Sequence, residues 1–191
     1  IIRTTFSPEK IRHWNRRTIK EVSRLVTDGP HVTPTYVPHG VPFVTVTNIK
    51  SGHLNFENVS YVTDDDHKQF SARAKAERGD ILYSKDGTLG IPCVVDTDRE
   101  FSFFVSVAII KLRRDLVDPH FVAYAMTSPF VMQKVEHLGA GAGLKHIVLK
   151  SIRSLEIFCP PLHEQQRIAG VIKEQMTAVE KARAATEEEL N

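Results

Sequence analysis

The 191-residue sequence predicts an α+β fold: a mixed, largely antiparallel β domain with flanking helices, followed by a long C-terminal helix of the coiled-coil type. Three observations support this prediction. β-Branched and aromatic residues are densest between residues 79 and 112, where Gly- and Asp-rich turns divide them into pieces of strand length. Patterns typical of helices flank this region. Residues 162–191 contain one glycine, no proline and many Ala, Glu, Lys and Gln residues, which favours one long helix.

The N-terminal segment is expected to begin with a helix over residues 7–26. A serine and a proline at its start suit the cap and the first turn, and apolar residues recur at imperfect helical spacing. Asp28-Gly29-Pro30 would end this helix. Residues 31–40 contain two prolines and a glycine, so we expect a loop there that leads into a short strand at residues 42–46.

Strands are expected to dominate the middle of the chain. Ser51-Gly52 indicates a turn, and residues 59–62 are typical of a strand. Thr63 and Asp66 resemble a capping box at the start of a helix that would run to about Ala76. Three further strands are expected at residues 79–84, 90–95 and 101–112.

A helical segment over residues 119–138, interrupted at Ser128-Pro129, is expected to follow the strands. Four of its apolar residues are expected to face inward: Phe121, Ala125, Val131 and Val135. The glycine-rich residues 139–143 would end it in a mobile or tightly turning loop. One more strand is expected within residues 147–158.

Pro160-Pro161 separates two expected units, a domain of residues 1–160 and a C-terminal helix of residues 161–191. A helix of this length would extend about 45 Å. A narrow apolar seam with steps of three or four residues runs along it and suits pairing with a second helix. The members of the seam are Ile168, Ile172, Met176 and Val179. Packing of the helix on its own domain is the alternative.

Composition excludes several classes of protein. Hydrophobic residues make up 41% and charged residues 25%, as in soluble globular proteins. No apolar run reaches the length of about 18 residues that a membrane span needs, and no signal-peptide pattern follows Ile1, so we expect a cytoplasmic protein without a membrane partner. Cys93 and Cys159 are the two cysteines and form no CxxC pair, so we expect neither a disulfide framework nor a thiolate zinc site.

The net charge of +2 is unevenly distributed along the chain. Residues 1–60 carry a net charge of +4 and residues 101–161 one of +3, whereas residues 61–100 carry −3 and residues 162–191 carry −2. The two basic blocks could form one face that binds nucleic acid, or they could be scattered over a solvated surface.

No catalytic motif is complete in this sequence. His163-Glu164 begins like HExxH, but Arg167 stands where the second histidine would be. The glycine run that ends at Gly143 is not followed directly by lysine, and no Ser or Thr follows Lys145 to bind magnesium. Asp66-His67-Lys68 fits half of a nuclease pattern, but the sequence contains no Pro-Asp pair. The sequence therefore predicts neither a catalytic residue nor a metal site.

Four segments, taken in order, match the motifs of a known family. Residues 28–36 (DGPHVTPTY), which follow Trp14 at a distance, are similar to a DGxHxTPxY stretch. Residues 41–52 contain VPF and NIKSG, which are similar to GIPFI and NIxxG. Residues 79–90 contain GDIL and GTLG, which are similar to GDIL and GxxG. Residues 160–168 (PPLHEQQRI) match a PPLxEQxxI junction into a spacer helix. Together these segments resemble the DNA specificity subunits of type I restriction-modification systems.

The resemblance implies a non-catalytic protein that binds double-stranded DNA at a specific sequence. It would direct a methyltransferase (modification) subunit, and in the full complex a motor endonuclease (restriction) subunit, to a bipartite target. S-Adenosylmethionine, ATP and magnesium would bind those partner subunits, and no cofactor is expected on this chain. Two other functions stay open: the recognition portion of a fused restriction-methylation enzyme, and an assembly module without DNA binding.

One departure from the family pattern concerns the number of domains. These subunits normally contain two target recognition domains, each followed by a spacer helix, whereas this sequence contains one of each. The chain is therefore expected to be a half-size subunit that pairs as a homodimer or with a second half-subunit, or else half of a longer subunit.

Loops rich in polar side chains are the expected DNA contacts, because base edges need paired donors and acceptors and phosphates need Lys or Arg. The candidates for base readout are Asn48, His53, Asp86 and Thr88. The candidates for phosphate contacts are Lys50, Lys85, Arg113, Arg114 and Lys145. The same loops also supply His31, Thr33, Tyr36 and His146. Each of these side chains could instead be an ordinary turn residue that satisfies its own backbone.

Overall fold

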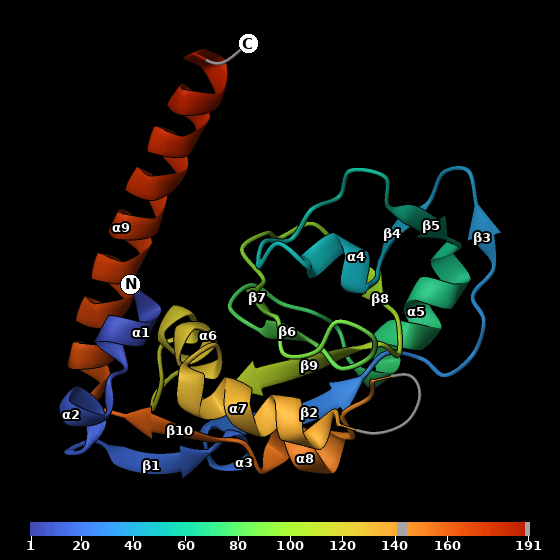
Figure 1. The fold of residues 1–191 in the computed structure, drawn as a ribbon. Coiled ribbons are helices and arrows are strands. Elements are labelled where there is room, and N and C mark those ends of the chain that lie inside the picture. The colour runs from blue at the N-terminus through green and yellow to red at the C-terminus, as the bar shows by residue number, and fades with distance from the viewer. Residues whose placement is uncertain (141–144, 190–191) are drawn as a thin grey trace.

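The part of the chain before residue 162, here called the body, contains three sheets in the described residues, 1–140 and 145–189, of this computed structural model (Figure 1). The central sheet is antiparallel, with the order β2 (Ser23–Asp28), β9 (Val107–Leu112), β6 (Ile81–Ser84) and β7 (Pro92–Val94). The second has the order β3 (Tyr36–Val37), β5 (Ser60–Val62), β4 (Val41–Val44) and β8 (Ser102–Phe103). The third pairs β1 (Asn15–Thr18) with β10 (Glu156–Cys159). Because only β4 and β8 are parallel neighbours among these pairs, the predicted α+β class with a mixed, largely antiparallel β part is confirmed.

Short helices surround the sheets, and one long helix follows them. The short helices are α1 (Ile2–Thr5), α2 (Pro8–Ile11), α3 (Ile19–Val22), α4 (Val46–Ile49), α5 (Asp64–Arg73), α6 (Pro119–Met126), α7 (Pro129–Leu138) and α8 (Leu149–Arg153). The long helix, α9 (Leu162–Glu189), extends past the body (Figure 1). In the described part of the chain, no helix is long and apolar enough to cross a membrane.

The predicted helix over residues 7–26 is wrong. Only α2 and the single turn of α3 are helical there; β1 and most of β2 are strands, and residues 12–14 form a turn. Both strands pair with distant parts of the chain: Asn15 lies opposite Cys159, and Val26 lies opposite Ile110. Cross-strand pairing and burial of the apolar side chains override a helical pattern that was already imperfect.

Several predicted elements are present with shifted bounds. The strand expected at residues 42–46 is β4, and the strand expected at residues 59–62 is β5. The helix expected after Thr63 is α5. One half of the predicted capping box is formed, because the backbone N–H of Asp66 donates to Thr63 Oγ1 (3.2 Å), whereas Asp66 Oδ2 accepts from the Thr35 backbone N–H. The strands expected at residues 79–84 and 90–95 are β6 and β7.

Three predictions need a further remark. Residues 101–112 form two strands, because a turn in which Val107 N–H donates to the Phe104 carbonyl (2.9 Å) sends β8 and β9 to different sheets. The helical segment broken at Ser128-Pro129 is confirmed as α6 and α7, and its four inward apolar residues are all buried. Residues 147–158 contain a helix, α8, before β10 begins. Most of the predicted glycine loop lies outside the described residues.

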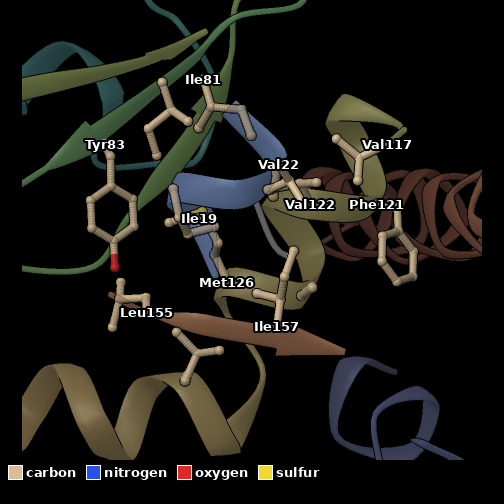
Figure 2. Packing of buried hydrophobic residues seen from close by; sticks show 14 of the residues in the cluster. Ile19, Val22, Ile81, Tyr83, Val117, Phe121, Val122, Met126, Leu155 and Ile157 are labelled. Atoms are coloured by element: carbon tan, nitrogen blue, oxygen red, sulfur yellow. The ribbon is translucent and has the colours of Figure 1, made fainter. Parts of the chain in front are cut away.

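The central sheet is buried on both faces. Side chains alternate along its strands, so that Ile81 and Tyr83 enter one apolar cluster while Leu82 enters a second on the opposite face. Figure 2 shows the first cluster, in which Val122 and Met126 of α6 pack toward the sheet together with side chains of α3 and β10. The sheet is thereby held as a rigid support for the loops at its two ends.

The first turns of α9 belong to the core of the body. Ile168 and Ile172 are only 6% and 1% exposed, and Met176 packs against the same cluster, whereas Val179 is 57% exposed. The expectation that these four residues form one seam for a partner helix therefore needs correction: Ile168 and Ile172 are used within this chain. The packing expected as the alternative holds for this first part of the helix, because apolar side chains of α6 lie within reach of it.

Candidate nucleic-acid interface

Loops from distant parts of the chain meet at one end of the central sheet. Strands β2 and β6 both run antiparallel to β9, so their carboxyl ends lie together beside its first residues. Asp28 is opposite Ala108, and Ser84 is opposite Val107. This arrangement places Asp28 next to Lys85, which follows β6 directly. We call the polar residues gathered here the polar cluster: Asp28, His31, Arg73, Lys85, Asp86 and His146.

Lys85 is the centre of the polar cluster and is only 4% exposed. Its Nζ lies 3.4 Å from Asp28 Oδ2 and 3.4 Å from Asp86 Oδ2. The predicted phosphate contact at Lys85 is therefore corrected, because an ammonium group buried between two carboxylates cannot reach a DNA backbone. A charge is buried at this place only because it is paired.

Asp28 contacts three basic side chains. Besides Lys85, the Arg73 Nη2 atom of α5 donates to Asp28 Oδ1 (2.9 Å), and His31 Nε2 lies 3.4 Å from the same oxygen. Sequence reasoning did not single out Asp28 as a functional side chain and missed Arg73. Asp28 stood in the DGxHxTPxY match, but no pattern in the sequence pointed to Arg73.

The loop over residues 31–36 presents side chains to solvent from a fixed backbone. Thr33 is exposed, the His31 side chain is 63% exposed, and Tyr36 is 55% exposed. The backbone is held because Thr35 N–H donates to Asp66 Oδ2 (2.6 Å), and the Tyr36 ring meets the Phe43 ring edge-on at 6.1 Å. These side chains are therefore accessible to a ligand, and their contact with DNA stays a prediction.

The loop after β6 is joined to the segment that starts at residue 145. Gly87 N–H donates to the Lys145 carbonyl (2.9 Å), and Asp86 contacts the His146 ring. Thr88, Lys145 and His146 have exposed side chains. The structure thus brings together three of the predicted DNA-binding loops at one end of the sheet.

Asn48 is buried and its side chain is used within the chain. It is only 7% exposed, and its Oδ1 accepts hydrogen bonds from the Thr45 backbone N–H (3.0 Å) and the Thr45 hydroxyl (3.1 Å), which caps α4. The prediction for Asn48 is therefore corrected. Lys50 and His53 are exposed in the following loop, where His53 Nε2 lies 3.7 Å from Glu180 Oε1 of α9. Neither of these two side chains has a contact with the polar cluster.

Arg113 and Arg114 lie at the opposite end of the central sheet. They follow β9, whose first residue is opposite Ser84, so the length of this strand, about 17 Å, separates them from the polar cluster. Arg113 Nε donates to the Ser23 carbonyl (3.3 Å), and Arg114 donates to the Arg78 carbonyl. The antiparallel order of the strands therefore places these two predicted phosphate contacts at the end of the sheet away from the three loops.

One serine–histidine pair and both cysteines are buried. His67 Nδ1 lies 2.8 Å from the Ser102 hydroxyl, but Ser102 is only 3% exposed and offers no surface to a substrate. Burial raises the pKa of the Cys93 and Cys159 thiols to about 12, so both stay protonated at neutral pH. Among the residues that the structure describes, no three metal-ligating side chains gather.

Comparisons with known proteins agree on one family. A family model described as type I restriction modification DNA specificity domain matches residues 12–189. The MjaVIII type I restriction enzyme specificity subunit of Methanocaldococcus jannaschii is 21% identical over 165 residues, which cover 84% of this chain and 39% of that protein. The HsdS subunit from Thermoanaerobacter tengcongensis has a TM-score of 0.66 and 19% identity over 94% of this chain and 46% of that one. The S subunit from M. genitalium has a TM-score of 0.60 and 19% identity over 88% and 40% of the two chains.

These matches fit the geometry described above. The two solved structures show that the fold is shared, and the chain spans less than half the length of each of the three proteins. The family model covers almost the whole sequence, from α9 back to the residues before β1. This chain belongs to the type I restriction modification DNA specificity domain family.

Proposed function

We propose that this chain recognises a specific DNA sequence and directs a separate modification subunit of a type I restriction-modification system to it. The observation that carries the proposal is the gathering of three loops with exposed polar side chains at one end of a rigid sheet. Membership of the specificity family supports it. Methylation, and cleavage by a motor endonuclease, would occur in the partner subunits, which would also bind S-adenosylmethionine, ATP and magnesium.

The exposed side chains of these loops suit the two tasks of DNA recognition. His31, Thr33 and Thr88 offer hydrogen-bond donors and acceptors of the kind that base edges require. Lys145, beside them, is a cation without a carboxylate partner in the described residues, and it suits a phosphate. Because the loop backbones are tied to α5 and to each other, little ordering would be needed when DNA binds.

The first test is whether the chain prefers one duplex. The purified chain, with its modification subunit, is used to enrich duplexes from a randomised pool, and fluorescence anisotropy compares the enriched duplex with a random duplex of equal length. A preference of about a thousandfold or more is typical of specific recognition and would support the proposal. Equal affinity for the two duplexes would contradict it and favour an assembly module.

Substitution of Lys145 by alanine is expected to weaken binding to both duplexes by a similar factor. A lysine at a phosphate releases about one counterion, so the slope of log K against log salt should fall by about 0.9. Binding titrations at several salt concentrations measure this slope. The control is Lys20→Ala, which removes an exposed lysine from α3, before β2 begins, and should leave the slope unchanged. Equal slopes for the two variants would contradict a phosphate contact of Lys145.

The exposed part of α9 suits a spacer. Beyond Met176 the helix leaves the core of the body, and a rigid helix converts its length into a fixed distance between two recognition units. The second unit would come from another copy of this chain or from a second domain, since the chain spans less than half of its relatives. Two identical copies would recognise a palindromic target in two halves.

Insertion of one heptad after Ala182 is expected to widen the gap between the two half-sites. Seven residues add about 10 Å of helix, which is about three base pairs of duplex, while the half-site bases stay the same. Sequencing of methylated sites in a host that carries the variant and its modification subunit measures the gap. In the control, the same heptad replaces residues 183–189, so that the length is unchanged. An unchanged gap in the insertion variant would contradict the spacer role.

A further inference from the structure

The carboxylate of Asp28 is buried and contacts a side chain of its own loop, one of α5 and one that follows β6. Its side chain is 5% exposed. One oxygen lies 3.4 Å from Lys85 Nζ, and the other accepts from Arg73 Nη2 at 2.9 Å and lies 3.4 Å from His31 Nε2. Apart from its two histidines, the polar cluster contains two acidic side chains, Asp28 and Asp86, and two basic side chains, Arg73 and Lys85.

The contacts continue from Lys85 into the segment that starts at residue 145. Ile147 N–H donates to the Lys85 carbonyl (2.9 Å), and the adjacent Asp86 contacts His146. Lys85 N–H in turn donates to the Ser106 carbonyl (3.0 Å), in the turn between β8 and β9. Asp28 is therefore the point at which all three exposed loops of the candidate interface are connected.

Stability alone does not account for such an arrangement. A buried ion pair costs desolvation energy, and apolar side chains of the same volume commonly stabilise a protein as well or better. A set of charged hydrogen bonds with fixed directions, by contrast, holds its partners in one geometry. In this protein two of the partners, His31 and Lys85, belong to loops of the candidate interface, and the third, Arg73, belongs to α5.

We infer that Asp28 is a positioning residue for DNA recognition: the contacts of its buried carboxylate with Lys85, Arg73 and His31 hold the three loops in the one arrangement that matches the target sequence. This inference rests on the proposed function. Asp28 itself is too buried to contact DNA, and it acts through the side chains that it holds. Lys85 serves the same purpose from inside the protein.

The test uses the full chain and two probes, the duplex enriched by the wild type from a random pool and a random duplex of equal length. Asp28→Asn keeps the shape of the side chain but removes the charge. Affinity for the enriched duplex should fall about tenfold or more, the equivalent of one good base contact. Affinity for the random duplex should stay the same or rise slightly, because a negative charge has been removed.

The double variant D28N/K85M separates positioning from stability. Replacing both members of the pair by neutral side chains should restore much of the melting temperature lost in D28N. Preference for the enriched duplex should stay lost, because Arg73 and His31 no longer have a charged partner. The double variant also keeps the test decisive if D28N alone fails to fold. The matched control is Asp115→Asn, an exposed carboxylate at the other end of the sheet, which should leave the preference unchanged.

Two results would overturn the inference. Recovery of both melting temperature and preference in the double variant would show that the pair only stabilises the fold. An equal gain in affinity for both duplexes in D28N would show that Asp28 acts only as a nearby negative charge. If the wild type enriches no duplex at all, the proposed function itself fails, and this is seen before any variant is measured.

Discussion

Gly29→Ala is expected to destabilise the protein severely. A β carbon at residue 29 would lie 2.6 Å from the Phe104 carbonyl carbon and 2.8 Å from its oxygen, and closer still to the carbonyl oxygen of Phe103. These are backbone atoms of the turn between β8 and β9, so relief requires movement of the chain itself. We expect a loss of about 3 kcal/mol or more in the free energy of unfolding, at the upper end of overpacking effects. Thermal unfolding should show a fall of about 6 °C or more in melting temperature.

The same substitution elsewhere provides the control for Gly29→Ala. Gly170 lies within α9, and a β carbon there would meet no atom within 4 Å. Alanine favours a helix over glycine by about 1 kcal/mol, so Gly170→Ala should raise the melting temperature slightly. Similar melting temperatures for the two variants would contradict the close packing of Gly29 against the neighbouring turn.

Gln165→Ala is expected to have the second large effect. Gln165 is 1% exposed, and its Oε1 accepts from the Asp118 backbone N–H (3.0 Å) while its Nε2 donates to the carbonyls of Leu116 (3.2 Å) and Pro160 (2.9 Å). Alanine would leave these buried groups without a partner, at about 1 to 3 kcal/mol each where water cannot reach them. We expect a total loss of about 3 kcal/mol or more, measured by urea unfolding.

The neighbouring glutamine tests whether position or residue type matters. Gln166 is exposed on the same turn of α9, so Gln166→Ala should change the free energy of unfolding by less than about 0.5 kcal/mol. Two of the three hydrogen bonds of Gln165, those with Asp118 and Leu116, tie the start of α9 to the segment before α6 and so help to fix the direction in which the helix leaves the body. Equal, small effects of the two substitutions would contradict this role.

Elements defined by local signals could be predicted from the sequence. The proline break between α6 and α7, the threonine cap of α5 and the glycine-poor stretch of α9 depend on residues within a few positions of each other. The region that failed, residues 7–26, depends on partners more than 80 residues away in β9 and β10. No periodicity within one segment reveals which distant strand it will meet.

The candidate site was predicted in its loops and less well in its side chains. His31, Thr33 and Lys145 are exposed where a ligand could reach them. Lys85 and Asn48 have the same polar character in the sequence but are buried by their surroundings. Whether a single polar residue is buried depends on how the sheets pack, which cannot be predicted from the neighbouring residues in the sequence.

The apolar side chains at the start of α9 have a practical consequence for engineering. Ile168 and Ile172 complete the core of the body, so this core extends past the proline pair into the helix. A chimera that swaps specificity between two relatives should therefore be joined after Ile172. A join at Pro160-Pro161 would place the apolar side chains of another protein's helix against the core of this body. The two sets of side chains would leave cavities or overpack.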